Sequence, residues 1–356
     1  MAWPRIVMAA GLAFLVASLH GQEQSTPPPL QNPDSGFRFK SGVELINVTA
    51  SVFDASGRFV PGLQREDFIV YEDDQPQPVS HFTAERVPVS LGIALDTSGS
   101  MLGEKIRAAQ TAFDRFLYDL LGPEDEIFLY RFSDRPVLLQ GWTTDRALLS
   151  RALGRVTAAG ATSMYDAVAE AVSLAATGRH RKKALLVLSD GNDTTSKAKL
   201  RDVKQVIRET DALVYAIGID CGVESDRRVR ESTRFQRRGP MPIPFPFPPG
   251  GRRGLPPRQP QPFPPPQGRT WNQGCGDSVD SGALRDMTDD SGGRTEIIRN
   301  PRDLELATAS IADELSKQYY LGYLSPGKKD GRWHSIRVEL RNRSYRIRAR
   351  RGYVAS

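Results

Sequence analysis

The pattern of apolar and polar residues divides the chain into two β-patterned ends and a central region of alternating strands and helices. Apolar and polar residues alternate through 46–52, the period of a half-buried strand. Further short strands are predicted at 68–72 and 79–84, each beside turn residues. Near the C-terminus the same alternation recurs at 334–340 and 345–349, and we expect these two segments to form a hairpin with a basic outer face.

Neither end of the chain has enough predicted strands to form a sandwich by itself. We therefore predict that residues 39–86 and 324–356 pair into one small β-sandwich, with the central region inserted between them. The alternative is two separate β appendages, which would show no strand pairing between the two ends of the chain.

The central region, residues 87–323, has the pattern of a doubly wound α/β fold with a mostly parallel sheet. Residues 87–95 are apolar apart from Ser90, as in a strand that is covered on both faces. Apolar residues then recur at helical spacing through 106–120. The further predicted strands are 127–132, 137–140 (an edge strand), 184–188, 214–219, 295–298 and 319–321, and the further helices are 144–153, 165–176, 203–210, 282–287 and 304–315.

Oxygen-bearing side chains follow three of these apolar segments. Asp96, Ser98 and Ser100 come directly after the first strand, Thr162 precedes a helix, and Asp190 ends a second apolar strand. Ligands of open α/β sheets bind beyond the carboxyl ends of the strands. Carboxylates and hydroxyls suit a hard cation such as Mg²⁺.

This combination of motifs, in this order, resembles the von Willebrand factor type A domain and its metal-ion-dependent adhesion site over about residues 87–320. The resemblance implies that Ser98, Ser100 and Thr162 are direct ligands of a divalent cation, and that Asp96 and Asp190 supply the charges that hold it. It further implies Mg²⁺, with Mn²⁺ and Ca²⁺ as alternatives, and an open position that an acidic side chain of a protein partner fills. The whole arrangement also looks like exported proteins related to this domain that are described from acidobacteria.

Other interpretations of these residues stay open at the level of sequence. Ser100 and Thr162 are also common types of helix cap. The oxygens of 193–196 are those of a solvated loop or, alternatively, of a second cation site. Asp134 and Asp145 are interpreted as surface or capping residues.

Residues 1–21 have the form of a secretory signal peptide, with one arginine followed by a short apolar core. The alternative is a retained N-terminal membrane anchor. The polar, proline-rich residues 22–38 are expected to form a disordered spacer. We therefore expect an exported protein that is periplasmic, on the cell surface or secreted.

The net charge of +6 comes mainly from one proline-rich insertion, residues 222–274, which we expect to be disordered. Between Cys221 and Cys275, ten arginines stand against three acidic residues, and the rest of the chain is close to neutral. The insertion is expected to bind an anionic envelope surface, or else to be a solvated tether, and nucleic acid is not an expected partner of an exported protein. The two cysteines bracket it, so we expect a disulfide between them; two unrelated thiols are the alternative.

Enzymatic functions find little support in the sequence. None of the four histidines lies near the predicted loop cluster, and no phosphate-binding Gly-x4-Gly-Lys-Ser/Thr loop is present. We expect a non-enzymatic adhesion or scaffold protein with no small-molecule substrate. The alternatives are a structural envelope protein in which the metal only stabilises the loops, and a phosphotransferase with Asp96 as nucleophile.

Overall fold

The computed structural model describes residues 44–220, 279–325 and 330–355. The predicted signal peptide (1–21), the spacer (22–38), the insertion (222–274) and the two cysteines, Cys221 and Cys275, lie outside the described residues. No helix among the described residues is long and apolar enough to cross a membrane.

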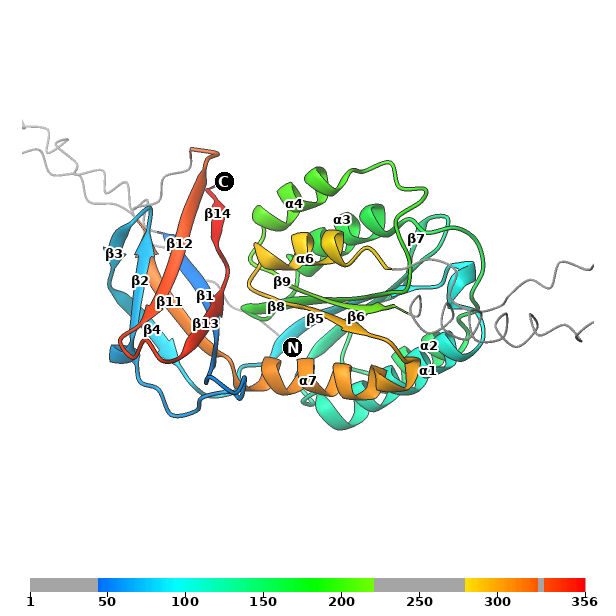
Figure 1. Cartoon of the computed structure of the whole chain (residues 1–356), viewed down its shortest axis with the longest axis horizontal. Helices are drawn as coiled ribbons and strands as arrows, with labels where there is room; N and C mark the ends of the chain where they lie inside the picture. The colour runs from blue at the N-terminus through cyan, green and yellow to red at the C-terminus, as the bar shows by residue number, and fades with distance from the viewer. Residues whose placement is uncertain (1–43, 221–278, 326–329, 356) are drawn as a thin grey trace, which may run out of the picture. The chain divides into compact units, whose positions relative to one another are not determined.

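The central region forms a six-stranded sheet in the order β10-β9-β8-β5-β6-β7 (Figure 1). All neighbouring strands are parallel except β7, which runs antiparallel to β6 at one edge. The predicted α/β fold with a mostly parallel sheet is thus confirmed. The strands are β5 (Val89–Asp96), β6 (Glu126–Phe132), β7 (Pro136–Thr143), β8 (Lys182–Ser189), β9 (Leu213–Ile219) and β10 (Thr295–Ile298).

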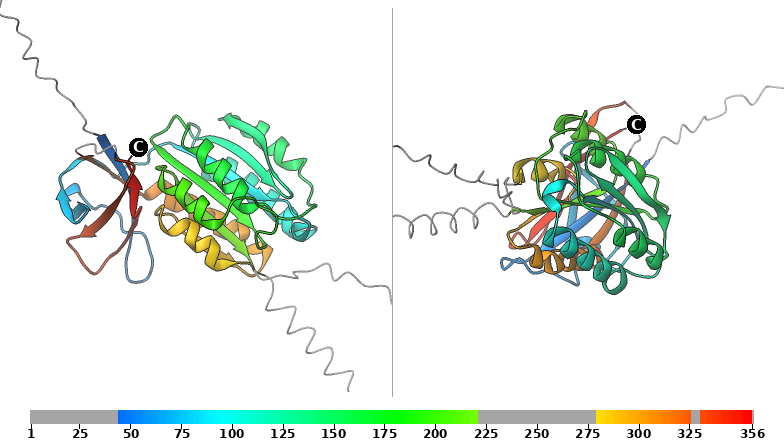
Figure 2. Two further views of the ribbon diagram at one scale, coloured as in Figure 1. Left: turned by 90° about the horizontal axis from the view of Figure 1, so that it is seen from above. Right: turned by 90° about the vertical axis from the view of Figure 1, so that its right-hand side faces the viewer.

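Helices cover both faces of this sheet (Figures 1 and 2). One face packs on α1 (Glu104–Arg115), its continuation η3 (Phe116–Leu120), α2 (Arg146–Gly154) and α7 (Leu304–Lys317). The other face packs on α3 (Met164–Ala175), α4 (Leu200–Arg208) and α6 (Ser281–Asp289). Short helical turns lie at η1 (Arg65–Asp67), η2 (Gly99–Met101) and η4 (Pro301–Asp303).

The central strand β5 is buried along its whole length. Leu91, Ile93 and Leu95 point into the core beneath α1 and α7, because successive side chains of a strand alternate between its faces. On the opposite face Gly92 makes room for Phe128, since a Cβ at this glycine would lie 2.2 Å from the Phe128 ring. The packing of β5 therefore brings its carboxyl end, Asp96, to a fixed place at the edge of the sheet.

The two ends of the chain form a β-sandwich of two four-stranded sheets, β13-β1-β11-β4 and β14-β12-β2-β3. The N-terminal strand β1 pairs with the C-terminal β13, and β2 pairs with β12. The predicted sandwich is confirmed, and the alternative of separate appendages is wrong. Its strands are β1 (Glu44–Phe53), β2 (Phe68–Glu72), β3 (Gln75–Gln77), β4 (Val79–Thr83), β11 (Tyr319–Ser325), β12 (Trp333–Leu340), β13 (Arg346–Ala349) and β14 (Gly352–Val354).

Two predictions about this region were wrong. The sequence pattern predicts a strand of the α/β sheet at 319–321, but β11 pairs with β1 and β4 in the sandwich. A short apolar run does not indicate which of two sheets it joins. The hairpin of 334–340 with 345–349 also does not form, because β12 pairs with β2 and β14 while β13 crosses to the other sheet and pairs with β1.

Candidate metal centre

The five side chains singled out in the sequence all lie at the carboxyl ends of the central strands. Asp96 is the last residue of β5, and Ser98 and Ser100 follow it in the turn at η2. Asp190 directly follows β8, the parallel neighbour of β5. Thr162 lies in the loop before α3. Parallel strands end at the same edge of a sheet, and this explains why residues so far apart in sequence come together.

Hydrogen bonds join the three loops to one another. The first and second loops are joined by the backbone, where Gly99 N donates to Gly160 O at 2.9 Å. The first and third are joined by side chains, where Ser100 Oγ donates to Asp190 Oδ1 at 2.7 Å. The second and third are joined at Thr162, whose carbonyl oxygen accepts from Thr194 N at 2.8 Å.

The spacing of the oxygens fits a small octahedral cation. Ser98 Oγ lies 3.0 Å from Ser100 Oγ, which lies 2.7 Å from Asp190 Oδ1. Adjacent ligands of Mg²⁺ are about 3.0 Å apart when the metal–oxygen bonds are about 2.1 Å. A Cβ on Gly191 would be 3.9 Å from both Ser100 Oγ and Thr162 Oγ1, so the two hydroxyls lie near the same point of the third loop. The donor set and its spacing thus fit a hard divalent ion.

Both carboxylate oxygens of Asp96 are engaged by protein, as are those of Asp190. In Asp96, Oδ1 accepts from Ser98 N at 2.8 Å, and Oδ2 accepts from Ser189 Oγ at 2.5 Å. Burial, with a smaller contribution from the charge of Asp190, raises the pKa of Asp96 to about 6 against the lowering effect of these hydrogen bonds. A cation at this edge would offset the cost of that buried charge. The arrangement supports a role for Asp96 as a charge behind the hydroxyls rather than as a direct ligand.

Lys105 is a member of this site that sequence reasoning missed. Its ammonium forms an ion pair with Asp190 Oδ2 and donates to the carbonyl oxygen of Ser100 at 3.1 Å. Lys105 is in the first turn of α1, on the same buried helix face as Ala109 and Ala112. A lysine at a core-facing helical position directly after the Asp-x-Ser-x-Ser loop is the sequence signal that could have identified it.

The loop after Asp190 is fastened to the start of α3. Asp193 Oδ1 accepts from Tyr165 N at 3.1 Å and from Ser196 Oγ at 2.5 Å, while Thr194 Oγ1 accepts from Thr162 N at 3.0 Å. These oxygens therefore hold the second and third loops together. The contacts give no support to a second cation site at 193–196.

The helix-capping interpretation is not supported by the side-chain contacts. Ser100 lies inside η2, and its hydroxyl bonds to Ser98 and Asp190 instead of to a helix amide. The residue at the start of α3 is Ser163, without a side-chain cap, and Thr162 lies one position earlier.

The two other aspartates serve local structure, as predicted. Asp145 caps α2 by accepting from the amides of Ala147 and Leu148. Asp134 is exposed and accepts from Ala161 N at 2.8 Å, next to Gly160, whose φ of 88° needs a glycine.

Comparison with known proteins agrees with this geometry. Residues 91–192 match the family model of the von Willebrand factor type A domain, a range that contains all five predicted site residues. A search of the curated proteins finds no match to this chain.

Similar solved structures include three bacterial proteins, two of which are described as von Willebrand factor domains. The von Willebrand factor domain of the type V pili tip protein Mfa5 from Porphyromonas gingivalis is 25% identical, with a TM-score of 0.29, over 31% of this chain and 40% of that chain. The conserved hypothetical protein BatB from Bacteroides thetaiotaomicron is 17% identical, with a TM-score of 0.43, over 64% of this chain and 98% of that one. A von Willebrand factor type A protein from Catenulispora acidiphila is 16% identical, with a TM-score of 0.46, over 89% of this chain and 65% of that one.

Proposed function

Because the chain contains a von Willebrand factor type A domain, we propose that it is an adhesion or scaffold protein that binds an acidic group of a protein partner through a divalent cation. The observation that carries the proposal is the spacing of 3.0 and 2.7 Å along Ser98 Oγ, Ser100 Oγ and Asp190 Oδ1. The distance between the two hydroxyl oxygens matches neighbouring ligand positions around one small ion, and Asp190 lies within hydrogen-bond distance of the second hydroxyl.

Each residue of the loop cluster has a role in this proposal. Ser98, Ser100 and Thr162 would be direct ligands, and Asp96 and Asp190 would supply negative charge. An all-oxygen set favours Mg²⁺, with Mn²⁺ and Ca²⁺ as alternatives.

The charge balance of the cluster supports the capture of a carboxylate. Two aspartates and the ammonium of Lys105 sum to a net charge of −1, so a divalent ion would leave the site with a net charge of +1. An acidic side chain of a partner could then occupy the open coordination position and neutralise that excess.

A non-enzymatic function is part of the proposal. The rival phosphotransferase mechanism needs Asp96 as a nucleophile. Asp96 is fully buried, and both of its oxygens accept hydrogen bonds, one from Ser98 N and one from Ser189 Oγ. This environment favours a charge-supplying role over nucleophilic attack.

We place the protein outside the cytoplasm, in the envelope, on the surface or in the medium. The proposal rests on the signal-like residues 1–21 and on the arginine-rich segment 222–274, which would bind an anionic envelope surface.

The first test is calorimetric titration of the full chain with Mg²⁺. We expect one bound ion in the wild type and at least a tenfold weaker affinity in Thr162→Ala, because one of three hydroxyl ligands is lost. Thr111→Ala, at an exposed threonine of α1, is the matched control and should bind as the wild type does. Equal affinities in all three proteins would refute the metal centre.

The second test separates capture of a partner from a purely structural metal. Envelope proteins retained by the immobilised wild type are compared with and without a chelator, and with the Thr162→Ala protein. If the metal captures a partner, at least one retained protein should be lost both with the chelator and with the Thr162→Ala protein. A melting temperature that rises with Mg²⁺, with no chelator-sensitive partner, would instead favour the structural envelope protein.

A further inference from the structure

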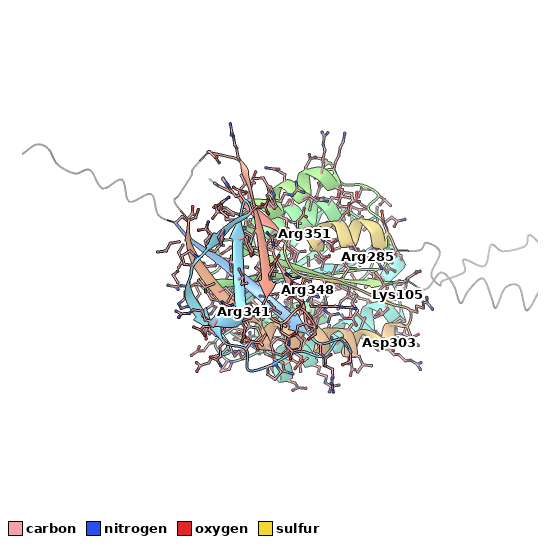
Figure 3. The ribbon with its side chains drawn as sticks, turned by 60° about the vertical axis from the view of Figure 1, so that its left-hand side comes forward. Lys105, Arg285, Asp303, Arg341, Arg348 and Arg351 are labelled. Carbon is pink, nitrogen blue, oxygen red and sulfur yellow. The ribbon has the colours of Figure 1, made fainter. Side chains whose placement is uncertain are left out.

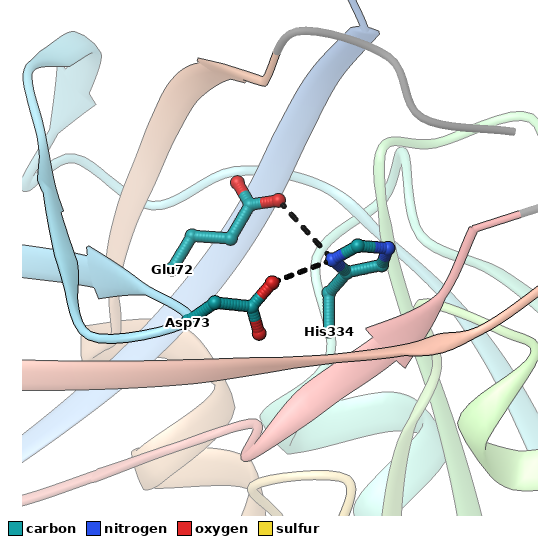
Figure 4. Close-up of side chains that lie close together, drawn as sticks. All are labelled: Glu72, Asp73 and His334. Atoms are coloured by element: carbon teal, nitrogen blue, oxygen red, sulfur yellow. Dashed lines mark hydrogen bonds and ion pairs between the residues drawn. The ribbon is translucent and has the colours of Figure 1, made fainter. Parts of the chain in front are cut away.

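A second group of metal-ligand side chains lies in the β-sandwich, in a different part of the chain from the loop cluster. Glu72 ends β2, Asp73 follows it in the turn to β3, and His334 is on the neighbouring strand β12 (Figure 4). The backbone fixes their arrangement, because Asp73 N donates to Ser335 O at 3.0 Å and Ser335 N donates to Asp73 Oδ1 at 2.9 Å.

The three side chains point toward one another at distances that suit a tetrahedral metal. His334 Nδ1 lies 2.8 Å from Asp73 Oδ2 and 3.8 Å from Glu72 Oε1, and one potential ligand atom from each residue lies within 4.8 Å of the others (Figure 4). Ligands of tetrahedral zinc, with bonds of about 2.0 Å, are about 3.3 Å apart. The two nitrogen–oxygen distances lie on either side of that value.

The imidazole is oriented as a metal ligand would be. Its other nitrogen, Nε2, lies 3.2 Å from Asp330 Oδ1, which can hold the ring proton there and leave the Nδ1 lone pair facing Asp73 and Glu72. Histidines that bind metals commonly donate their second N–H to a carboxylate in this way. The ring of Tyr353 also stacks on His334, with centroids 5.5 Å apart.

Glu72 is buried and only partly satisfied. Its Oε1 accepts from Ser325 Oγ and from Tyr353 OH, both at 3.0 Å, which fixes the carboxylate beside His334. Its Oε2 is buried and has no hydrogen-bond partner within the described residues. A buried carboxylate normally has its charge compensated by a cation or by several hydrogen bonds.

The local charge is strongly negative. Glu72, Asp73 and Asp330 place three carboxylates around one imidazole, and in the described part of the chain none of the three forms an ion pair with an arginine or lysine. Even a protonated ring would leave an excess of negative charge. A divalent cation would offset that excess.

We propose that Glu72, Asp73 and His334 form a zinc site, with the fourth position left to water or to a group of a partner. One imidazole nitrogen with two carboxylate oxygens is a donor set that suits Zn²⁺ better than Mg²⁺ or Ca²⁺. The side chain of Asp73 is 45% exposed, so an ion can enter from that side. The bound ion would tie the turn after β2 to β12, two segments from opposite ends of the chain.

The test titrates Zn²⁺ into the metal-free full chain in competition with a chromophoric zinc chelator. The Thr162→Ala background weakens the loop cluster as a competing zinc site. We expect one zinc per chain in that background and at least a hundredfold weaker binding when His334→Asn is added. Asp330→Asn should weaken binding about tenfold to a hundredfold, because it removes only the orientation of the ring.

His81→Asn is the matched control, since His81 belongs to the same sandwich but is exposed and makes an edge-to-face contact with Tyr320. It should keep the affinity of the background. Equal zinc affinities with and without His334 would overturn the proposal, and His334 would then be an ion-pair partner of Asp73 and Asp330 only. Zinc binding that depends on His334 but not on Thr162 would support this proposal even if the loop cluster bound no metal.

Two further measurements cover the case in which His334→Asn does not fold. Glu72→Gln, which keeps the shape of the side chain, should also weaken zinc binding. Wild-type crystals soaked in zinc should show an anomalous peak between the three side chains. No peak at saturating zinc would overturn the proposal.

Discussion

Single side chains set the charge of the loop cluster. Lys105 lies outside the sequence motif, but its ammonium adds a positive charge to the cluster. Its ammonium contacts Asp190, one of the two carboxylates proposed to hold the ion (Figure 3 labels Lys105). A positive charge at this place repels a divalent cation and satisfies Asp190 without one. We therefore expect Lys105 to lower the metal affinity of the proposed site and to raise the positive charge that would remain for a partner.

Lys105→Met should bind Mg²⁺ at least tenfold more tightly than the wild type, a difference of about 1.4 kcal/mol. The reason is that the substitution removes the repulsion and leaves Asp190 without its cation. Calorimetric titration measures the effect, and Lys105→Arg, which keeps the charge, is the control. A weaker affinity in Lys105→Met would mean that the lysine orients Asp190 instead.

At the scale of elements, the start of β8 is tied to the end of α7. The ammonium of Lys182, the first residue of β8, donates to the carbonyl oxygen of Leu315 in the last turn of α7. A donor at this position satisfies one of the free carbonyl groups at a helix C-terminus. Burial lowers the pKa of Lys182 to about 7, although the charge of Glu314 acts in the opposite direction.

This shift predicts how stability depends on pH. Between pH 7 and about 10 the unfolded chain binds a proton on Lys182 that the folded chain has released, so the free energy of unfolding should rise with pH. The contribution is at most about 1.4 kcal/mol per pH unit. Lys182→Met should remove this rise in urea unfolding measured across that range.

Lys183→Met is the control for the pH experiment. Lys183 is the next residue in β8 and pairs with Asp211 at 3.1 Å, and its substitution leaves Lys182 in place. The rise with pH should therefore persist in this variant. An unchanged rise in Lys182→Met would show that another group is responsible.

At the scale of the whole described fold, one carboxylate joins the sandwich to the α/β region. Glu314 of α7 accepts from Ser51 of β1 at 3.0 Å and from Tyr215 of β9 at 2.9 Å, and it forms ion pairs with Arg294 and with Arg348 of β13. Burial would raise the pKa of Glu314, but the charge and hydrogen bond of Arg348, together with Arg294, lower it. The Glu314 carboxylate is thus charged, and both of its oxygens have hydrogen-bond or ion-pair partners (Arg348 is labelled in Figure 3).

Glu314→Ala should lower the free energy of unfolding by roughly 3–5 kcal/mol, because it leaves Arg348 and Tyr215 without their shared partner. Glu305→Ala on the same helix is the control. It removes only an exposed ion pair with Arg115 and should cost less than about 1 kcal/mol. Similar losses in the two variants, measured by urea unfolding, would contradict a special role for Glu314.

The pattern of apolar and polar residues by itself predicted the α/β core and most of the sandwich strands, and the resemblance to the von Willebrand factor type A domain added the five residues of the loop cluster. Such patterns report which side of an element is buried, and the buried strand that ends at Asp96 is clear from its composition. The likeness to exported acidobacterial proteins and the disulfide between Cys221 and Cys275 stay predictions.

Only the tertiary structure decided which sheet each short strand joins and which charged groups meet across the chain. Tyr319–Ser325 pairs within the sandwich, and β12 and β13 lie in different sheets. Lys105 forms an ion pair with Asp190. His334 likewise meets Glu72 and Asp73 from the opposite end of the sequence. The physical reason is that pairing partners and ion pairs depend on distances between remote segments, whereas periodicity reports only the local division between buried and exposed faces.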